Sequence, residues 1–553
     1  MKKKIRKLYT VLMALFIPAC LLSQYSDHNI ISQKAASMSR EYSGLCKTSS
    51  LVKTAGGKDI WLITIGKGDR DNKPAVAILG GIEGNYLLGR ELALGFAAEI
   101  LRQSSDPEIA EILEKITFYI MPDVSPDASE QYFSQLKYDR TTNNRPDDDD
   151  RDFLVDEDSY EDLNNDGFLT LLRIADPSGK YIESPDDNRI MVLADLSKGQ
   201  TGNYHVFTEG IDNDKDGCLN EDVVGGVNFN RNFTYNYEEF GKNAGPYPIS
   251  EPESKAVADF LYDHFNIFAT VAFGPQDNLG LPPEIKDDGD SDAKQIDFQE
   301  DMGYDIETDH KPNVIKKSDA KVIKLVSDRY HELTGAKGAP RTIPASGNFA
   351  DWSYFHYGRY SFSTPGWWFP LEKDDNPEAS FLKYAGPERS RDIFVPWTEI
   401  NHPDFPDKKA EIGGIKPFVL INPPADAIEA LVKSHYRFIV SLASLHPELE
   451  FLDEKTEKIA GGLYRVSLKI HNKGVFATGT KAAERNIWTR VMRLSISLSD
   501  GQSVVSGLKV QRINRLQGDE SAEFSWLISG KGQLEITAGA VNTGNISKKL
   551  EIR

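Results

Sequence analysis

From about residue 50 the chain alternates short apolar runs with segments of helical periodicity, and this order most constrains the fold. Residues 60–65 and 76–79 are predicted strands, and residues 87–101 place apolar side chains on one face of a helix. This order predicts an α/β fold: a mixed sheet with helices on both faces. Further helices are predicted at 108–115, 314–333 and 425–445, and further strands at 116–121, 267–273 and 360–363.

The composition changes after residue 445. Four short segments there alternate apolar and polar residues between Gly, Asn and Asp turns, which predicts a β-sandwich of about 100 residues. The predicted organisation is an α/β domain at 35–447 with an acidic insertion at 140–226, then a β-sandwich at 450–553. The four sandwich segments are 464–470, 494–498, 522–527 and 534–538.

Charge limits the partners of this chain. The formal net charge is −20 and the sequence pI is about 5.1, which argues against nucleic acid or an anionic membrane surface and favours cations. Three cysteines are too few for a disulfide framework, although one bridge between Cys46 and Cys218 stays an option.

The first residues have the pattern of an export signal. A basic stretch at 2–7 precedes an apolar stretch at 8–17, so residues 1–24 are predicted to be a signal peptide. The mature protein is then periplasmic, secreted, or lipid-anchored at the cell envelope through Cys20. No later apolar run approaches the ~20 residues that a transmembrane helix needs.

A motif in the middle of the chain carries the first chemical signal. Residues 225–233 read GGVNFNRNF, and Ser250-Glu251-Pro252-Glu253 follows after a loop. Ser250 is predicted to cap a helix, with Glu253 reaching back to the cap. Asn230 and Arg231 set an amide beside a guanidinium, whose planar fork of donors suits a carboxylate. Taken alone, the Asn-Arg pair is a weak signal, because a solvated arginine that pairs with a neighbouring acid is the more common case.

These motifs together resemble the zinc carboxypeptidase family. The segment 348–354, NFADWSY, is similar to the family's Gly-Ser-x-Asp-Trp-x-Tyr, and 74–82 is similar to the strand that enters its zinc site. The resemblance spans about residues 40 to 445. It implies a Zn²⁺-dependent peptidase fold in which Asn230 and Arg231 hold the C-terminal carboxylate of a peptide or a peptidoglycan-type ligand.

The positions that the resemblance assigns to zinc and catalysis hold other residues. The His-x-x-Glu pair of the family falls on Glu83 and Tyr86, the third ligand on Gly274, and the catalytic glutamate on Pro365. Ile343 takes the place of the tyrosine that closes over substrate. A catalytic zinc needs about three ligands and a carboxylate base, so we expect zinc to be absent although the family uses it.

The insertion contains three acidic loops on one template. Oxygen donors at positions 1, 3 and 5 with glycine at position 6 are typical of a loop that wraps Ca²⁺. No loop has a glutamate at position 12, so the loops resemble EF-hand-like or thrombospondin-type loops; a solvated acidic loop is the alternative. The candidate ligands are Asp148, Asp150, Asp152, Asp156 and Asp158, then Asp162, Asn164 and Asp166, then Asp212, Asp214, Asp216, Asn220 and Asp222.

Three functional hypotheses remain open. The first is an exported carboxypeptidase-like pseudoenzyme that binds carboxylates through Asn230 and Arg231. The second is a working metallocarboxypeptidase whose ligands lie elsewhere, and the third is a calcium-ordered structural or adhesion protein. His310, His356 and His402 have no partners at ligand spacing and are expected to have packing or surface roles.

Overall fold

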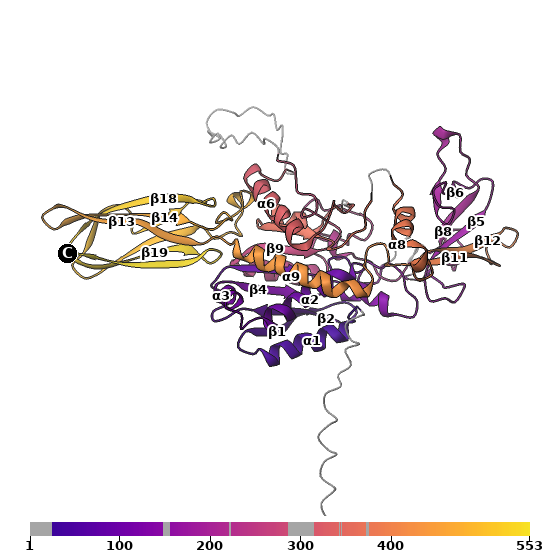
Figure 1. Ribbon diagram of the computed structural model, residues 1–553, viewed down its shortest axis with the longest axis horizontal. Helices are drawn as coiled ribbons and strands as arrows, with labels where there is room; N and C mark the ends of the chain where they lie inside the picture. Colours follow the sequence, from indigo (N-terminus) through magenta and orange to yellow (C-terminus); the bar gives the residue numbers. More distant parts are fainter. Residues whose placement is uncertain are drawn as a thin grey trace, which may run out of the picture.

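Figure 1 shows the computed structural model, an elongated molecule with a central α/β body, a β-sandwich at one end and a second sheet at the other. The structure describes residues 25–147, 155–156, 158–220, 223–285, 314–341, 343, 345–371 and 375–553. The predicted signal peptide with Cys20, the first acidic triplet Asp148, Asp150 and Asp152, and Asp222 and His310 lie outside these residues.

The central sheet confirms the predicted mixed topology. Its strand order is β1-β2-β4-β3-β9-β10. The β1–β2 and β2–β4 pairs are antiparallel, whereas β3 pairs in parallel with both β4 and β9, and β9 with β10. Because β3, β4 and β9 are buried along their whole length, they read as nearly continuous apolar runs. The outer strand β10 is also buried throughout, although it alternates aromatic residues with Ser361 and Ser363. The strands are β1(Cys46–Lys53), β2(Asp59–Ile65), β3(Ala75–Leu79), β4(Thr117–Met121), β9(Ile267–Phe273) and β10(Tyr360–Thr364).

Helices cover both faces of this sheet. Val76 and Ile78 of β3 point into one apolar core, and Ala77 and Leu79 point into the other, as the period of two requires. The first core is closed by α1(His28–Glu41), α2(Leu87–Arg102), α3(Pro107–Lys115), α6(Lys317–Thr334) and α9(Ile428–Ser444), and the second by α5(Pro252–Asp263) and α7(Phe349–Phe355). The one-turn helices are α4(Pro126–Ser129), η1(Glu130–Phe133), η2(Leu196–Lys198), η3(Phe229–Arg231), η4(Ala425–Ala427) and η5(Ala482–Arg485).

The acidic insertion contains strands that the sequence did not predict. They pair with a hairpin from much later in the chain and form an antiparallel sheet in the order β11-β12-β5-β8-β6-β7. One face of this sheet buries an apolar core made of Leu172, Ile174, Ala410 and Ile412. On the other face Arg173 is buried, pairs with Glu411 at 2.8 Å, and has its guanidinium 4.3 Å from the centre of the Trp397 ring. The elements are β5(Leu171–Ala175), β6(Tyr181–Glu183), β7(Met191–Leu193), β8(Tyr204–Thr208), β11(Phe394–Ile400) and β12(Ala410–Ile415). Helix α8(Pro377–Ile393), which is kinked at Gly386, leads directly into β11.

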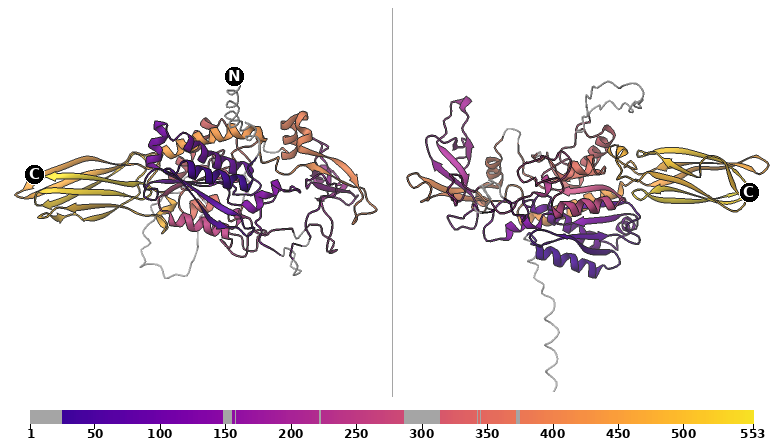
Figure 2. Two further views of the ribbon diagram at one scale, coloured as in Figure 1. Left: turned by 90° about the horizontal axis from the view of Figure 1, so that it is seen from below. Right: turned by 180° about the vertical axis from the view of Figure 1, so that it is seen from behind.

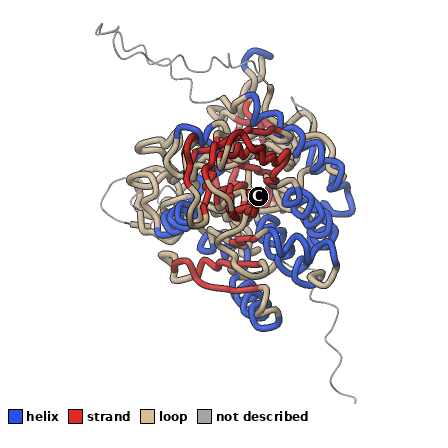
Figure 3. Tube along the Cα trace, turned by 90° about the vertical axis from the view of Figure 1, so that its left-hand side faces the viewer, coloured by secondary structure: helices blue, strands red, loops and turns tan. Residues whose placement is uncertain are grey.

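The C-terminal residues form two antiparallel four-stranded sheets, in agreement with the predicted β-sandwich. The orders are β13-β14-β18-β16 and β17-β15-β19-β20, and among the described strands none of these joins the central sheet. Figure 2 shows the sandwich projecting from one end of the central body, and Figure 3 looks at the molecule from that end. Trp526, Val466, Leu494 and Ile536 fill the space between the two sheets. The strands are β13(Leu449–Ala460), β14(Leu463–Asn472), β15(Met492–Leu498), β16(Ser503–Ser506), β17(Val510–Ile513), β18(Glu520–Ser529), β19(Gly532–Ala540) and β20(Gly544–Ile552).

Two local expectations are corrected. Glu251, not Ser250, is the N-cap of α5, and no side chain caps the helix. Ser250 instead donates to the carboxylate of Glu251 and accepts from the side-chain amide of Asn232. These tertiary contacts occupy the hydroxyl that would have capped the helix. No disulfide joins Cys46, which is buried, to Cys218, which is exposed.

No helix in the described part of the chain is long and apolar enough to span a bilayer.

Candidate functional site

The carboxyl ends of β3 and β9 bring four polar side chains together. Glu83 follows β3 and accepts hydrogen bonds from the amides of Asn228 at 2.9 Å and Asn230 at 3.1 Å. Gln276 follows β9 and accepts from the Asn230 amide at 2.7 Å. We call Glu83, Asn228, Asn230 and Gln276 the Glu83 cluster. All four are buried, at the sheet edge where open α/β folds place their ligand sites.

Asn230 is the centre of the Glu83 cluster. It is fully buried, and its side-chain oxygen accepts from the backbone N–H of Phe349 at 3.0 Å while its amide donates to Glu83 and Gln276. The backbone N–H of Asn230 donates to Asn228 at 2.7 Å. Both amide protons of Asn230 are therefore used inside the protein, and its role is to join η3, the end of β9 and the start of α7.

Arg231 forms no hydrogen bond with the described members of the Glu83 cluster. It is half-buried, and the recorded hydrogen bond of its guanidinium is to the carbonyl of Lys242 at 3.2 Å. Among the described residues no carboxylate forms an ion pair with Arg231. Its charge lowers the pKa of Glu83, but burial outweighs this effect and the pKa of Glu83 is raised. Arg145, a second arginine in the segment before the acidic loops, is paired with Glu251 at 2.8 Å.

The four positions assigned to zinc and base lie along the same sheet edge. The backbone N–H of Tyr86 donates to the Glu83 carbonyl at 3.0 Å, and burial followed by the Glu83 charge raises the pKa of the Tyr86 phenol. The backbone N–H of Gly274 donates to the Thr364 carbonyl at 3.1 Å, next to Pro365. A Cβ atom at Gly274 would lie 2.9 Å from the Cβ of Ile82, so this position has no room for a side chain without a shift.

Two of the three acidic loops are described, and they share one backbone geometry. Asp162 accepts from Gly167 N–H at 2.7 Å, and Asp212 accepts from Gly217 N–H at 3.1 Å. In both loops the fourth residue and the glycine have positive φ. The carboxylates of Asp212, Asp214 and Asp216 lie within 4.8 Å of one another. The Asp216 N–H favours the charged form of Asp214, but desolvation and the carboxylates of Asp216 and Asp212 raise its pKa.

Carboxylates from outside each triplet hold these loops. Asp158 accepts from the backbone of Asn213 at 3.0 Å and from that of Asn220, which fastens the third loop to the segment before the second. Glu209 is fully buried and accepts from Leu163 at 2.8 Å and from Thr170 at 3.1 Å. Asp156 accepts from Gly225 at 3.2 Å. Asp158 and Asp156 therefore bind backbone N–H groups, and Glu209 is a loop residue that the template did not identify.

Comparison with known proteins identifies the family of this chain. A family model described as "Zinc carboxypeptidase" matches residues 31–175 and 197–370. The chain belongs to the zinc carboxypeptidase family. A second model, described as a domain of unknown function, matches residues 448–551 of this carboxypeptidase-family chain.

Individual relatives of this zinc carboxypeptidase family member are distant. The chain is 23% identical over 124 residues to Carboxypeptidase M of Mus musculus, covering 21% of this chain and 28% of that protein. It is 26% identical over 120 residues to Carboxypeptidase B of Astacus astacus, covering 22% of this chain and 39% of that protein. Thrombin activatable fibrinolysis inhibitor and Carboxypeptidase A from Helicoverpa armigera align with TM-scores of 0.41 and 0.42, at 15% and 12% identity. These two alignments cover 76% of this chain, and 74% and 73% of theirs.

The described residues of this family member were compared with the needs of a zinc site, which takes about three His, Cys or carboxylate ligands. Within the described ranges, Asp212, Asp214 and Asp216 are the one group whose ligand atoms come together. At the sheet edge Glu83 offers a single carboxylate, and two amide groups already bind it. His356 is exposed and bonds to the Thr234 hydroxyl at 2.7 Å, whereas His402 is buried and bonds to the Gly210 carbonyl at 2.9 Å.

Sequence reasoning missed two members of the Glu83 cluster. Asn228 stands in the same motif as Asn230, two residues earlier, and reading that motif as extended would have placed both side chains on one side. Gln276 follows a predicted strand directly, and polar residues at the carboxyl end of a buried parallel strand are candidates for a site.

Proposed function

We propose that this zinc carboxypeptidase family member is an exported peptide-binding protein without zinc-dependent peptidase activity. Its ligand is the free carboxylate of a peptide or peptidoglycan stem, which binds to Arg231. The observation that carries the proposal is the half-exposed Arg231 guanidinium, which has no acidic partner in the described chain, beside a buried Glu83 that is bound by amides. Asn230 positions the Arg231 backbone and does not itself contact ligand in this proposal.

The composition of the sheet edge supports the loss of catalysis. The tyrosine phenol at 86 is a poor substitute for a carboxylate, Gly274 has no ligand atom, and Pro365 has no acid or base. No hydrolytic step is therefore assigned to this site. The binding step needs only the guanidinium fork, because charge-assisted hydrogen bonds to a carboxylate are about twice as strong as neutral ones.

Paired fluorescent peptides test this function, one with a free carboxyl terminus and one amidated. We expect the wild type to prefer the free acid, Arg231→Ala to lose about tenfold in its affinity for it, and both proteins to bind the amide equally. The matched control is Arg40→Ala, an exposed arginine in the last turn of α1. Zinc-dependent release of the C-terminal residue, abolished by a chelator, would instead establish the family's peptidase activity.

We also propose that the acidic loops bind calcium. The Asp212, Asp214 and Asp216 carboxylates are mutually close and exposed or half-exposed, and a hard cation with oxygen ligands would offset their repulsion. Calcium at about 100 times its Kd would then stabilise the fold by about 2.7 kcal/mol. The expected result is a lower Tm in excess chelator than in millimolar calcium. The difference in Tm between the two conditions should shrink in the double variant Asp212→Asn/Asp216→Asn. It should not shrink in Asp500→Asn, because Asp500 lies in a turn of the β-sandwich. Coincident melting curves for the wild type would mean that the loops are solvated only.

A further inference from the structure

A cavity of about 780 Å³ lies between the β-sandwich and the central body, away from the Glu83 cluster. Asn72 and Asn266 line it just before the starts of β3 and β9, whereas Glu83 and Gln276 follow the ends of the same strands. The cavity and the Glu83 cluster therefore lie at opposite edges of the central sheet. Its volume is in the range of pockets for small organic ligands and far exceeds that of one inorganic ion.

Three guanidinium groups line the sandwich side of this cavity. Arg493 on β15 and Arg512 on β17 are direct cross-strand partners, so their side chains share one face of the sheet. Arg490, in the loop before β15, has its guanidinium 3.8 Å from the centre of the Phe265 ring. All three are exposed, and no acidic residue of the described chain forms an ion pair with any of them. Like charges directly opposite on a sheet repel, and an anion between them would remove this cost.

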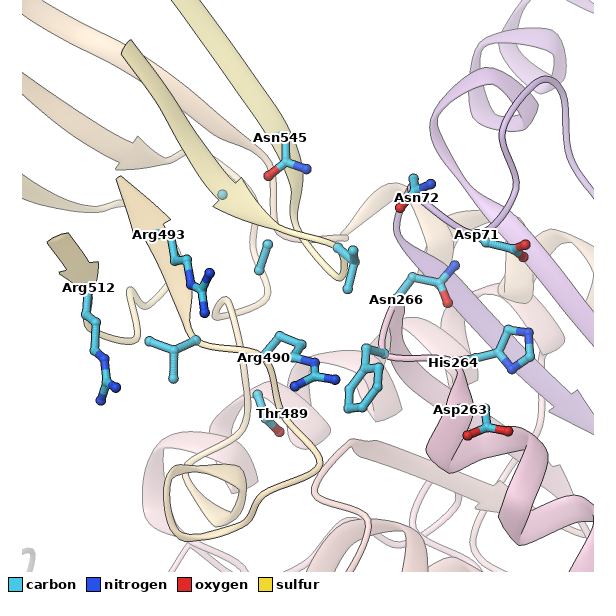
Figure 4. Close-up of a pocket in the computed structure, with 15 residues that line it drawn as sticks. Asp71, Asn72, Asp263, His264, Asn266, Thr489, Arg490, Arg493, Arg512 and Asn545 are labelled. Carbon is cyan, nitrogen blue, oxygen red and sulfur yellow. The ribbon is translucent and has the colours of Figure 1, made fainter. Parts of the chain in front are cut away.

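The opposite side of the cavity presents hydrogen-bond acceptors. Asp71 and Asp263 are exposed there, and Figure 4 shows them across the cavity from Arg493 and Arg512, with Arg490 between. Asn266 is 1% exposed. Its amide donates to the carbonyls of Arg70 at 3.1 Å and Lys73 at 2.9 Å, which fixes the orientation of the amide. Its side-chain oxygen has no hydrogen-bond partner within the described residues. A buried acceptor of this kind is costly unless a donor reaches it.

From this arrangement we propose that the cavity binds an oligosaccharide that carries carboxylate or sulfate groups. The anionic groups bind Arg490, Arg493 and Arg512, and uncharged hydroxyl groups donate to Asn266, Asp71 and Asp263. A ligand with negative charge at every position would meet repulsion from the two aspartates, whereas sugar hydroxyls supply donors without bringing a charge. The side chains of Asn72 and Asn545 offer both donors and acceptors beside these groups.

Calorimetric titration of the full-length protein tests this site. The probes are an oligogalacturonide, which carries carboxylates, a heparin-derived oligosaccharide of matched length, which carries sulfates, and a neutral oligosaccharide. We expect at least one acidic probe to bind, with an affinity that decreases as salt increases, and the neutral probe not to bind. Arg493→Ala and Arg512→Ala should each weaken binding about tenfold. Arg465→Ala, on the other sheet of the sandwich, should leave it unchanged.

Several results would overturn the proposal. They are the absence of binding by both acidic probes, equal binding by the wild type and the Arg493→Ala/Arg512→Ala variant, or equal binding by the neutral probe. Tighter binding of an oligoglutamate peptide than of either acidic sugar would assign the cavity to acidic peptides instead. Because these residues are exposed, the variants are expected to fold, and near-identical unfolding curves would verify this.

Discussion

At the scale of the residue, Asn230 determines whether the Glu83 cluster can form. We predict that Asn230→Asp lowers the free energy of unfolding by at least about 3 kcal/mol at pH 7, because it removes donors from two buried partners and adds a second buried carboxylate beside Glu83. Urea unfolding measures the change. Asn236→Asp, at an exposed position, is the matched control and should stay within about 0.5 kcal/mol. Equal stabilities would mean that the cluster contributes nothing to the fold.

The stability lost in Asn230→Asp should also depend on pH. Because a buried carboxyl pair prefers to share a proton, Asn230→Asp should lose less stability at pH 5 than at pH 7. Measuring the same unfolding curves at both pH values checks this sign. A larger loss at pH 5 would contradict it.

At the scale of the element, the first turn of α5 contains an acid whose charged form is disfavoured. Burial, with the charges of Asp127 and Glu251, raises the pKa of Glu253 from 4.5 to about 7, although local hydrogen bonds oppose the shift. The folded protein holds this proton while the unfolded chain releases it, so stability decreases as pH rises from about 4.5 to 7. We predict that Glu253→Gln flattens this slope and raises stability at pH 8 by on the order of 1–3 kcal/mol.

Denaturant unfolding at pH 5 and pH 8 measures the effect of Glu253→Gln. Glu239→Gln, at an exposed position before the same helix, should leave the pH slope as in the wild type. If Glu253→Gln and the wild type lose stability in parallel between the two pH values, the burial of Glu253 does not disfavour its charge in solution.

At the scale of the whole molecule, one buried carboxylate joins the sandwich to the central body. Asp319 in the first turn of α6 is fully buried, pairs with Arg515 of the sandwich at 3.1 Å and accepts from the backbone of Lys481 at 2.7 Å. We predict that Arg515→Met lowers the free energy of unfolding by about 3–5 kcal/mol, because it leaves Asp319 buried and without its counter-charge. Adding Asp319→Leu should restore part of the loss.

Calorimetry measures whether the sandwich and the central body unfold together. The wild type should unfold in one transition, whereas Arg515→Met should separate the melting of the sandwich from that of the central body. Arg465→Met, on an exposed sandwich position, is the control. One unchanged transition in Arg515→Met would place the coupling between the two parts elsewhere.

The sequence predicted the parts of the molecule whose signals are local. Helix α2 and strand β9 were predicted nearly to the residue, because their apolar periods are long and uninterrupted. The N-cap of α5 was misplaced because the hydroxyl of Ser250 is taken by Asn232, a contact that no local pattern encodes. For the same reason Gln276 was missed: its partner, Asn230, is 46 residues away in sequence.

The strands of the acidic insertion pair with strands that come much later in the sequence. Strand β5 needs β12, and Ile174 pairs with Ala410. A ribosome adds roughly 5–20 residues per second, so β5 and β8 leave it about 10–40 seconds before the strand that completes their sheet. During synthesis β5 therefore waits with an open edge, and the acidic loops on either side of the insertion strands would repel the same segment of a neighbouring nascent chain.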